Sequence, residues 1–308
     1  MINKINELIN LPLGPDMIGV APASRFDKND PIFKILPETK SVICLVYRIL
    51  RGTHRGIEEG TSYHHYTTMA IEVLDETIMP MMALRCARII EEEGYVALPQ
   101  KKSQQIMQEK DSTNPEILYN KIYRGKEKEY QMNFEESAAK CGLGEIGMSG
   151  TLLTDDFGPL QRYCFVLTDA EIEPTPEFVP HICDNCGECV KACPGKAIHD
   201  KTKVPWQCAA YYAGANMSKN PFMSPNALPH RDDRLEILNG EKQLSADDAM
   251  DVINNISYYP PIMHNYISSI CGNACDRACY IHLEEKGILN KKFKDKFRKR
   301  EEWVLDVK

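Results

Sequence analysis

Eight of the 12 cysteines fall between residues 183 and 279, and their spacing is the strongest sign of chemistry in the sequence. The segment HICDNCGECVKACPGKAIHD has the pattern C-x2-C-x2-C-x3-C-P, formed by Cys183, Cys186, Cys189 and Cys193. In bacterial ferredoxins the first three thiolates of this pattern hold one four-iron, four-sulfur cluster, and the fourth thiolate ligates a second cluster. The pattern therefore requires a second set of cysteines elsewhere in the chain.

That second set is present as Cys208 in WQCAAYY and as three cysteines in ICGNACDRACY. Following the ligand exchange of two-cluster ferredoxins, we predict one cluster on the first cysteine group and another on the second. A pair of zinc sites is the alternative, but the triple spacing followed by Cys-Pro favours iron–sulfur clusters. Two clusters indicate one-electron chemistry at low potential. The first cysteine group is Cys183, Cys186, Cys189 and Cys279; the second cysteine group is Cys193, Cys208, Cys271 and Cys275.

The glycine segment, residues 141–153 (CGLGEIGMSGTLL), matches G-x-G-x-x-G at Gly142, Gly144 and Gly147. This spacing indicates a dinucleotide site only where a strand precedes it and a crossover helix follows. Here a helical pattern, NFEESAAKC, precedes the glycines, and the residues after them leave little room for a helix. Two other interpretations stay open: a tight loop whose glycines allow close backbone packing, or a loop lying against some other large, flat cofactor.

Length and composition limit the kind of protein. The chain has 308 residues, of which 43% are hydrophobic and 26% charged, as in a folded soluble protein. It has neither an apolar run of about 18 residues nor an export signal, so we expect a cytoplasmic protein without membrane association. Many cysteines in that compartment indicate metal binding or redox chemistry. The net charge of −7 disfavours nucleic acid as a partner, although it leaves room for a local basic patch.

The elements that must position these motifs follow from periodicity. Strands are predicted at 16–22, 40–49, 95–99 and 161–169, and helices at 2–10, 133–141 and 66–93, the last divided or kinked at Pro80. Residues 100–128 have the composition of a surface excursion, and EIEPTPEFVP, with three prolines, marks a linker. We predict an α/β (α+β) N-terminal domain at 1–175, a ferredoxin-like domain with two 4Fe-4S clusters at 176–285, and a C-terminal basic helix at 286–308.

From about residue 16 to residue 279 the sequence resembles the cobalamin-dependent iron–sulfur reductases, the family of epoxyqueuosine reductase and the reductive dehalogenases. The most specific part is AAKCGLGEIGMSGTLLTDDFGPLQRYCFVLTD, followed by the linker and the cysteine motifs. Family members show A-G-L-G-W-I-G-K-N-T-L-L in this place. ILPETKSVICLVY resembles the second strand of the family, and TSYHHY resembles its Tyr-His segment.

The resemblance implies an N-terminal domain of the nitroreductase and corrinoid-processing type, which holds cobalamin in the base-off form next to the clusters. The glycine segment would lie along the corrin, where larger side chains would obstruct the ring. The motif D-x-H-x-x-G, which supplies a histidine ligand to cobalt in other cobalamin proteins, is absent from the sequence, and this absence suits a base-off cobalt that must be easily reduced. The cofactor-binding residues implied are Gly142, Leu143, Gly144, Ile146, Gly147, Ser149, Gly150 and Thr151.

The sequence departs from the family pattern at several positions, in the glycine segment, at the substrate acid and in the last cysteine group. Glu145, Met148 and Ser149 replace the Trp, Lys and Asn of the family, and the acid that protonates epoxyqueuosine has no clean counterpart. The last cysteines read C-x3-C-x3-C instead of C-x2-C-x3-C-P, so the second cluster site is slightly altered. Phe157-Gly158-Pro159 and Arg162 are more similar to the dehalogenases. The substrate therefore does not transfer with the resemblance.

Three further features have a functional and a structural interpretation. Tyr63 and His64 begin a helix and could donate a proton to substrate or a hydrogen bond to the corrin edge, or simply pack at the helix terminus. Arg162 could pair with a phosphate or acidic group of a substrate, or form a surface ion pair. The tail KKFKDKFRKR (291–300) predicts an amphipathic helix that docks Phe293 and Phe297, or a patch for tRNA or an acidic redox partner.

Together these features predict a reductase that works without oxygen and passes electrons from two 4Fe-4S clusters to a bound cobalamin. Its partners would be a low-potential electron donor, such as a ferredoxin or flavodoxin, and a small-molecule substrate. One alternative is an electron-transfer protein that reactivates a corrinoid protein. The other is an iron–sulfur reductase with a flavin in place of cobalamin.

Overall fold

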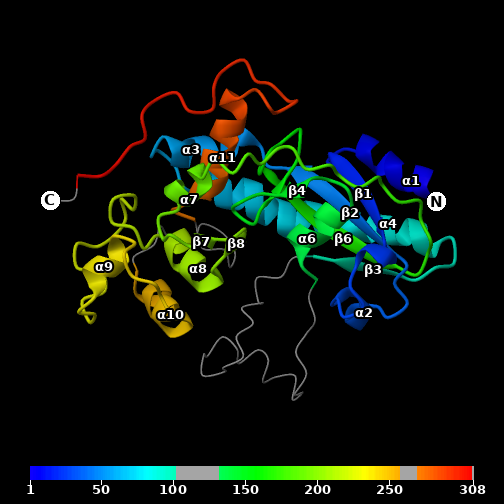
Figure 1. Cartoon of the computed structure of the whole chain (residues 1–308), viewed down its shortest axis with the longest axis horizontal. Coiled ribbons are helices and arrows are strands. Elements are labelled where there is room, and N and C mark those ends of the chain that lie inside the picture. The colour runs from blue at the N-terminus through cyan, green and yellow to red at the C-terminus, as the bar shows by residue number, and fades with distance from the viewer. Residues whose placement is uncertain (102–131, 257–268, 307–308) are drawn as a thin grey trace. The chain divides into compact units, whose positions relative to one another are not determined.

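The computed structural model describes residues 1–101, 132–256 and 269–306 (Figure 1). The chain divides into two units, neither of which is continuous in sequence. The first unit contains Met1–Tyr47, Ile78–Leu143 and Tyr163–Glu177, and the second contains Arg48–Thr77, Gly144–Arg162 and Phe178–Lys308. The domain limits predicted at 175 and 285 stay predictions, and the predicted excursion at 100–128 lies almost entirely outside the described residues.

A four-stranded sheet forms the centre of the first unit, with the order β1-β2-β6-β3. Its strands are β1 (Met17–Pro22), β2 (Ser41–Arg48), β3 (Ala97–Gln100) and β6 (Gln161–Thr168). β1 pairs antiparallel with β2, and β3 pairs antiparallel with β6. The two central strands are buried along nearly their whole length, which explains why they read as continuous apolar runs. All four predicted strands are confirmed, within a mixed α/β fold.

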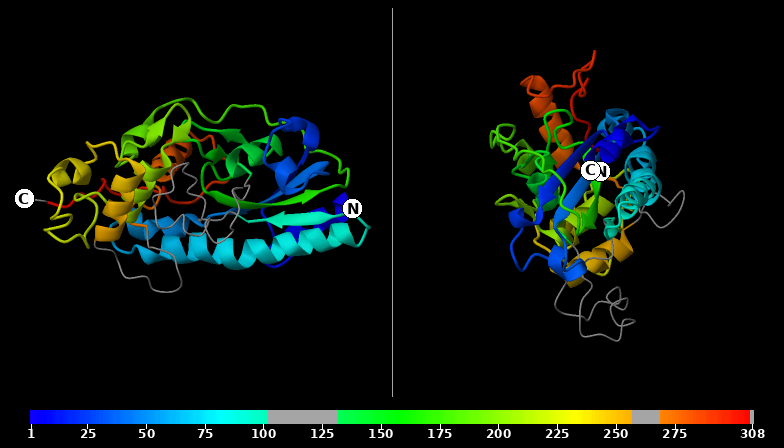
Figure 2. Two further views of the ribbon diagram at one scale, coloured as in Figure 1. Left: turned by 90° about the horizontal axis from the view of Figure 1, so that it is seen from below. Right: turned by 90° about the vertical axis from the view of Figure 1, so that its right-hand side faces the viewer.

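Short helical segments join these strands and two longer helices accompany them. The segments are α1 (Ile2–Asn6), η1 (Glu7–Asn10), η2 (Ala23–Arg25) and α2 (Ile32–Ile35). The helix α4 (Met79–Glu91) packs against β3 (Figure 2), and Pro80 lies in its first turn, where a missing N–H is tolerated. The helix α6 (Phe134–Lys140) is capped at its N-terminus by Asn133, whose side chain accepts the Glu136 N–H at 3.2 Å. The helices predicted at 2–10 and 133–141 are confirmed.

The second unit consists of helices and two hairpins. Its helices are η3 (Arg51–His54), α3 (Arg55–Glu58), the π-type turns η4 (Tyr66–Glu72) and η5 (Leu74–Ile78), α7 (Glu188–Ala192), α8 (Pro205–Ala213), α9 (Arg234–Leu238), α10 (Ala246–Asn255) and α11 (Ala274–Glu285). The hairpins join β4 (Glu145–Ile146) to β5 (Leu152–Leu153) and β7 (Ile198–His199) to β8 (Thr202–Lys203). α7 packs against α11, and α8 against α10. No helix in the described part of the chain has the length and apolarity needed to cross a membrane.

The glycine segment follows α6 and folds into the β4–β5 hairpin. Glu145 pairs with Leu153, and Ile146 pairs with Leu152. Neither the preceding strand nor the crossover helix of a dinucleotide-binding unit is present between residues 133 and 168. The dinucleotide interpretation is therefore excluded.

The helix predicted at 286–308 is not formed, because residues 286–306 contain no regular element. The segment docks through individual side chains instead. Phe297 is fully buried, whereas Phe293 is 51% exposed. Arg298 donates to the Glu58 carboxylate at 2.5 Å. A helix would place the many lysines and arginines of this tail three and four positions apart on one surface, where like charges repel. The contacts that Phe297 and Arg298 make with distant residues of the second unit therefore outweigh the local helical pattern of the tail.

His54 is a buried polar residue that the sequence did not single out. Its side chain is inaccessible to solvent, and its ring lies 4.4 Å from that of Tyr66. Neither ring nitrogen has a hydrogen-bond partner among the described residues. Burial, and secondarily the charge of Arg277, lowers the pKa of His54 to about 3. The folded protein therefore keeps this imidazole neutral.

This neutral imidazole predicts a loss of stability in mild acid. Because the unfolded chain binds a proton at His54 below about pH 6.5 and the folded chain does not, stability falls as pH falls through that value. His54→Phe should lose about 1.4 kcal/mol less than the wild type between about pH 7.5 and pH 5.5. Chemical unfolding at the two pH values measures the difference; equal losses in both proteins would contradict a neutral His54.

Candidate metal centres and the glycine segment

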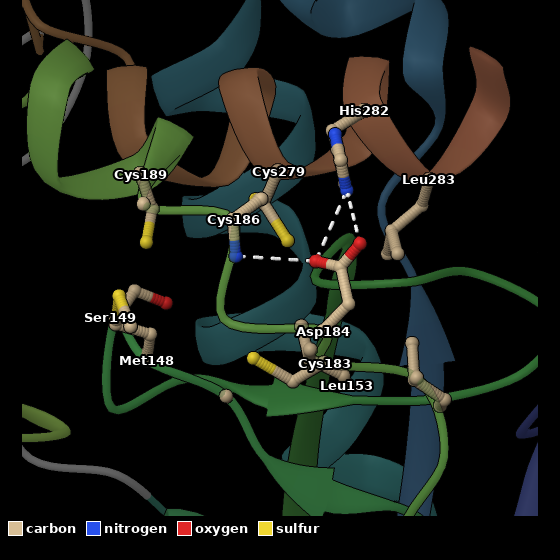
Figure 3. Close-up of a pocket in the computed structure, with 13 residues that line it drawn as sticks. Met148, Ser149, Leu153, Cys183, Asp184, Cys186, Cys189, Cys279, His282 and Leu283 are labelled. Carbon is tan, nitrogen blue, oxygen red and sulfur yellow. Dashed lines mark hydrogen bonds and ion pairs between the residues drawn. The ribbon is translucent and has the colours of Figure 1, made fainter. Parts of the chain in front are cut away.

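The first cysteine group lines a single cavity in the second unit. Its wall contains Cys183, Cys186, Cys189 and Cys279, and Figure 3 shows the sulfur atoms of Cys183, Cys189 and Cys279 directed into the shared space. Gly187, with φ of +79°, precedes α7 and lets the chain turn between Cys186 and Cys189. Cys279 follows Cys189 by 90 residues in the sequence, and the packing of α7 on α11 brings it to the same cavity. The predicted group is thus assembled from a loop and two helices.

The second cysteine group also comes together. Burial raises the pKa of Cys208 to about 11, and the nearby thiols of Cys271 and Cys193 add to this shift. Cys275 has Cys271 and Cys208 among the neighbours that raise its pKa. The eight cysteines therefore fall into the two groups predicted from their spacing. That these groups ligate iron stays a prediction.

The two groups meet in one patch of apolar packing. Cys189 of the first group, Cys275 of the second and Ile198 form one buried cluster, and Cys193 and Met148 pack on it. This packing places the two cysteine groups side by side.

The chemistry of the donors fits iron–sulfur clusters. Burial is the main cause that raises the pKa of Cys189, Cys271, Cys275 and Cys279, so these thiols do not ionise in the protein alone. A cationic metal centre compensates the charge of a buried thiolate and releases its proton. Four converging thiols at each site satisfy the ligand count of a 4Fe-4S cluster.

The glycines of the segment are explained by its own packing. A Cβ atom at Gly144 would lie 2.0 Å from the Leu153 carbonyl oxygen, and one at Gly147 would lie 2.8 Å from Leu153 Cδ1. Gly150 has φ of +71° and closes a turn by donating to the Gly147 carbonyl oxygen at 2.9 Å. In the first unit, a Cβ at Gly142 would meet the Pro176 carbonyl oxygen at 2.1 Å. These observations favour the tight-loop interpretation that the sequence left open.

The remaining residues implied for cofactor binding have varied surroundings. Leu143 is buried in the first unit. Ile146 is half-buried in the β4–β5 hairpin. Ser149 is buried, and with Met148 it lines the cavity of the first cysteine group (Figure 3). The Thr151 hydroxyl is engaged within the protein, by Lys203 at 2.8 Å and by an aspartate of α11. Contact of any of these residues with cobalamin stays a prediction.

Glu145 clamps the backbone that enters the first cysteine group. Its Oε1 atom accepts N–H bonds from His181 at 3.1 Å, from Cys183 at 2.8 Å, and from Ile182 between them. One carboxylate thus satisfies three consecutive donors and fixes the approach to Cys183. In the sequence Glu145 stood out only as a departure from the family Trp, and no local pattern indicated that it would face residues 36 to 38 positions later.

Tyr63 and His64 lie in the second unit, outside the lining of the first cysteine cavity. Tyr63 is buried edge-on against Phe222, with ring centroids 5.3 Å apart, and burial raises its pKa to about 12. The Tyr63 hydroxyl has no hydrogen-bond partner among the described residues. His64 is half-buried beside His65, and burial is the first cause that lowers its pKa. A role in proton donation stays a prediction for both.

Arg162 was predicted to pair with an acidic group of a substrate or to form a surface ion pair, and its environment differs from both. Its guanidinium makes a two-pronged ion pair with Asp75, in which Nε lies 2.5 Å from Oδ1, and the carboxylate is buried. Tyr66 and Tyr212, both of which have pKa values raised mainly by burial, lie near this guanidinium and near Cys271. The pair is therefore internal and not at the surface.

Comparison with known proteins supports the metal centres. Residues 176–199 match the family model described as a 4Fe-4S binding domain, so the chain contains such a domain. Over 92 residues it is 41% identical to a tetrachloroethene reductive dehalogenase of Desulfitobacterium hafniense, covering 28% of this chain and 15% of the relative. Over 120 residues it is 28% identical to that of Sulfurospirillum multivorans, covering 30% of this chain and 24% of the relative. The chain thus spans a quarter or less of these relatives, and the resemblance to the dehalogenases is confirmed over the matched segments.

Two solved structures are also similar to the chain. Epoxyqueuosine reductase from Streptococcus thermophilus is 15% identical and aligns over 85% of this chain and 69% of its own, with a TM-score of 0.45. A reductive dehalogenase, whose structure suggests a mechanism for B12-dependent dehalogenation, is 14% identical over 78% of this chain and 34% of its own, with a TM-score of 0.46. Neither likeness transfers a substrate or a partner to this chain.

The carboxylate clamp predicts how firmly the first site holds iron. In Glu145→Ala three backbone donors lose their acceptor, so reconstituted protein should release iron from the first cysteine group about tenfold faster under a chelator. Glu145→Gln keeps an oxygen acceptor and should stay closer to the wild type. Glu241→Ala, at an exposed carboxylate, is the matched control. Equal iron release from Glu145→Ala and this control would contradict the clamp.

The packing of the hairpin predicts a strong effect of one methyl group. Gly144→Ala should lower the free energy of unfolding by about 1–3 kcal/mol, because the new Cβ collides with the Leu153 backbone. Gly52→Ala, where nothing lies within 4 Å of the added Cβ, should cost far less. Unfolding curves for both variants test the idea, and a Gly144→Ala protein as stable as the wild type would refute it.

Proposed function

We propose that this protein is an oxidoreductase in which two 4Fe-4S clusters pass electrons to a bound cobalamin, for reductive chemistry on a substrate still to be identified. One observation carries the proposal. Met148 and Ser149 of the glycine segment line the cavity of the first cysteine group, and Met148 also packs on the apolar patch that contains Cys189 and Cys275. The segment that the family resemblance assigns to the corrin therefore adjoins the place where the two cysteine groups meet.

The residues of each site have distinct tasks in this proposal. The second cysteine group holds one cluster and the first holds the other, and their shared packing gives a short path for electrons. Glu145 fixes the loop that carries Cys183. Cobalamin, when bound, would supply a strongly reducing cobalt centre. Tyr63 and His64 are the proposed proton donors, and the proposed electron donor is a low-potential ferredoxin or flavodoxin.

A second candidate function is favoured by the packing of the glycines. Gly144 and Gly147 face atoms of the protein itself, so the absence of their side chains does not require a ring beside them. An electron-transfer protein that reactivates a separate corrinoid protein would need the same two clusters and no cobalamin of its own. Complex formation with a corrinoid protein distinguishes this candidate from the first.

The test is anaerobic reconstitution with iron, sulfide and hydroxocobalamin, followed by desalting, metal analysis and an absorption spectrum. We expect about eight irons and about one cobalt per chain, with a base-off spectrum. Eight irons without cobalt would remove the cobalamin proposal and leave electron transfer, or a flavin in place of cobalamin, as the next candidates.

Variants of single cysteines test the two sites separately. Cys183→Ser and Cys208→Ser should each reduce the iron content to about four per chain, because each removes one ligand of a different cluster. Cys86→Ala is the matched control, since Cys86 is a buried cysteine of the first unit that belongs to neither group, and its replacement should leave all the iron in place. Full iron content in Cys183→Ser and Cys208→Ser would refute the assignment of ligands.

A further inference from the structure

Asp276 is a buried acid placed between cysteines of the two groups. It lies in α11 directly after Cys275 and three residues before Cys279, so its side chain shares a face of the helix with Cys279. The Asp276 side chain is 4% exposed, and its Oδ1 atom lies 3.6 Å from Cys275 Sγ. Neither the cysteine motif nor the proposed route of electrons gives this residue a task.

The partners of Asp276 are hydrogen-bond donors and a cation. Asn273 Nδ2 donates to Oδ2 at 2.8 Å, and the Thr151 hydroxyl donates to Oδ1 at 3.2 Å. The Lys203 ammonium lies 3.9 Å from Oδ1 and donates to the Thr151 hydroxyl at 2.8 Å. Both carboxyl oxygens of Asp276 therefore accept hydrogen bonds beside a positive charge. The partners come from the glycine segment, from β8 and from the N-cap of α11.

The Asp276 carboxyl group lies next to cysteines of both groups. Its Oδ1 atom is 3.6 Å from Cys275 Sγ of the second group, and Cys279 of the first group follows three positions later on the same face of α11. The ammonium of Lys203 brings a positive charge to 3.9 Å from the same oxygen.

We propose that Asp276 is a positioning residue that holds the reduction potentials of both clusters low, and that Lys203 opposes it at the second cluster. Adding an electron to a cluster adds negative charge, and a carboxylate at close range in a poorly solvated interior disfavours that step. Through Thr151 the same network is tied to the end of the glycine segment. The inference rests on the two-cluster assignment proposed above, but it does not depend on cobalamin.

The experiment is a redox titration of reconstituted protein, followed by electron paramagnetic resonance, after metal analysis has shown about eight irons per chain. Asp276→Asn keeps the shape and removes the charge, so the midpoint potentials of both clusters should rise. Lys203→Gln should lower the potential of the second cluster, because it leaves Asp276 without its cation. A purely structural role would not move the potentials in opposite directions.

Asp184→Asn is the matched control for position. Asp184 Oδ1 accepts the Cys186 N–H at 3.2 Å, and this residue is linked to the first cysteine group alone (Figure 3). Its neutralisation should raise only the potential of the first cluster. Unchanged potentials in Asp276→Asn, or shifts of the same sign in Asp276→Asn and Lys203→Gln, would overturn the inference. If Asp276→Asn does not take up iron, the sign of the Lys203→Gln shift decides. A wild type that binds fewer than two clusters would instead overturn the proposed function.

Discussion

The arrangement of the second unit depends on the burial of thiols that must become thiolates. Burial raises the pKa of Cys208 to about 11 and the pKa of Cys275 well above its usual value. Neither of these two thiols therefore ionises at neutral pH in the protein alone. Metal binding reverses this, because a cationic centre replaces the proton. The free energy of metal binding would then be part of the free energy of folding, and a bound cluster would stabilise each helix that carries a cysteine of either group.

The acidic side chains beside the cysteine groups also have partners within the protein. Glu145 is satisfied by three backbone N–H groups, and Asp276 by two neutral donors and Lys203. Both acids lie close to cysteines, and each accepts hydrogen bonds from several donors. Because burying a carboxyl group without such partners costs free energy, these donors stabilise the surroundings of the cysteine groups.

The sequence predicted the features that depend on local pattern. The central strands β2 and β6 were visible as apolar runs, and the two cysteine groups followed from the cysteine spacing together with the ligand exchange of two-cluster ferredoxins. The contacts that could not be predicted join residues far apart in the chain, such as Glu145 with His181 and Arg162 with Asp75. The predicted tail helix was wrong because Arg298 and Phe297 find partners far away in sequence, which local periodicity does not encode.

The interleaving of the two units has a consequence for how the metal centres form. The second unit takes residues 48–77 and 144–162 from the region ahead of the cysteine motif, and its last cysteine comes at 279. Its native contacts therefore have a high contact order, and much chain entropy is lost before they close. A fragment beginning at the linker would lack Glu145, Met148 and Thr151 and could not complete the surroundings of either cysteine group. During synthesis, the first three cysteines emerge long before Cys279, so cluster assembly is coupled to the folding of nearly the whole chain and does not precede it.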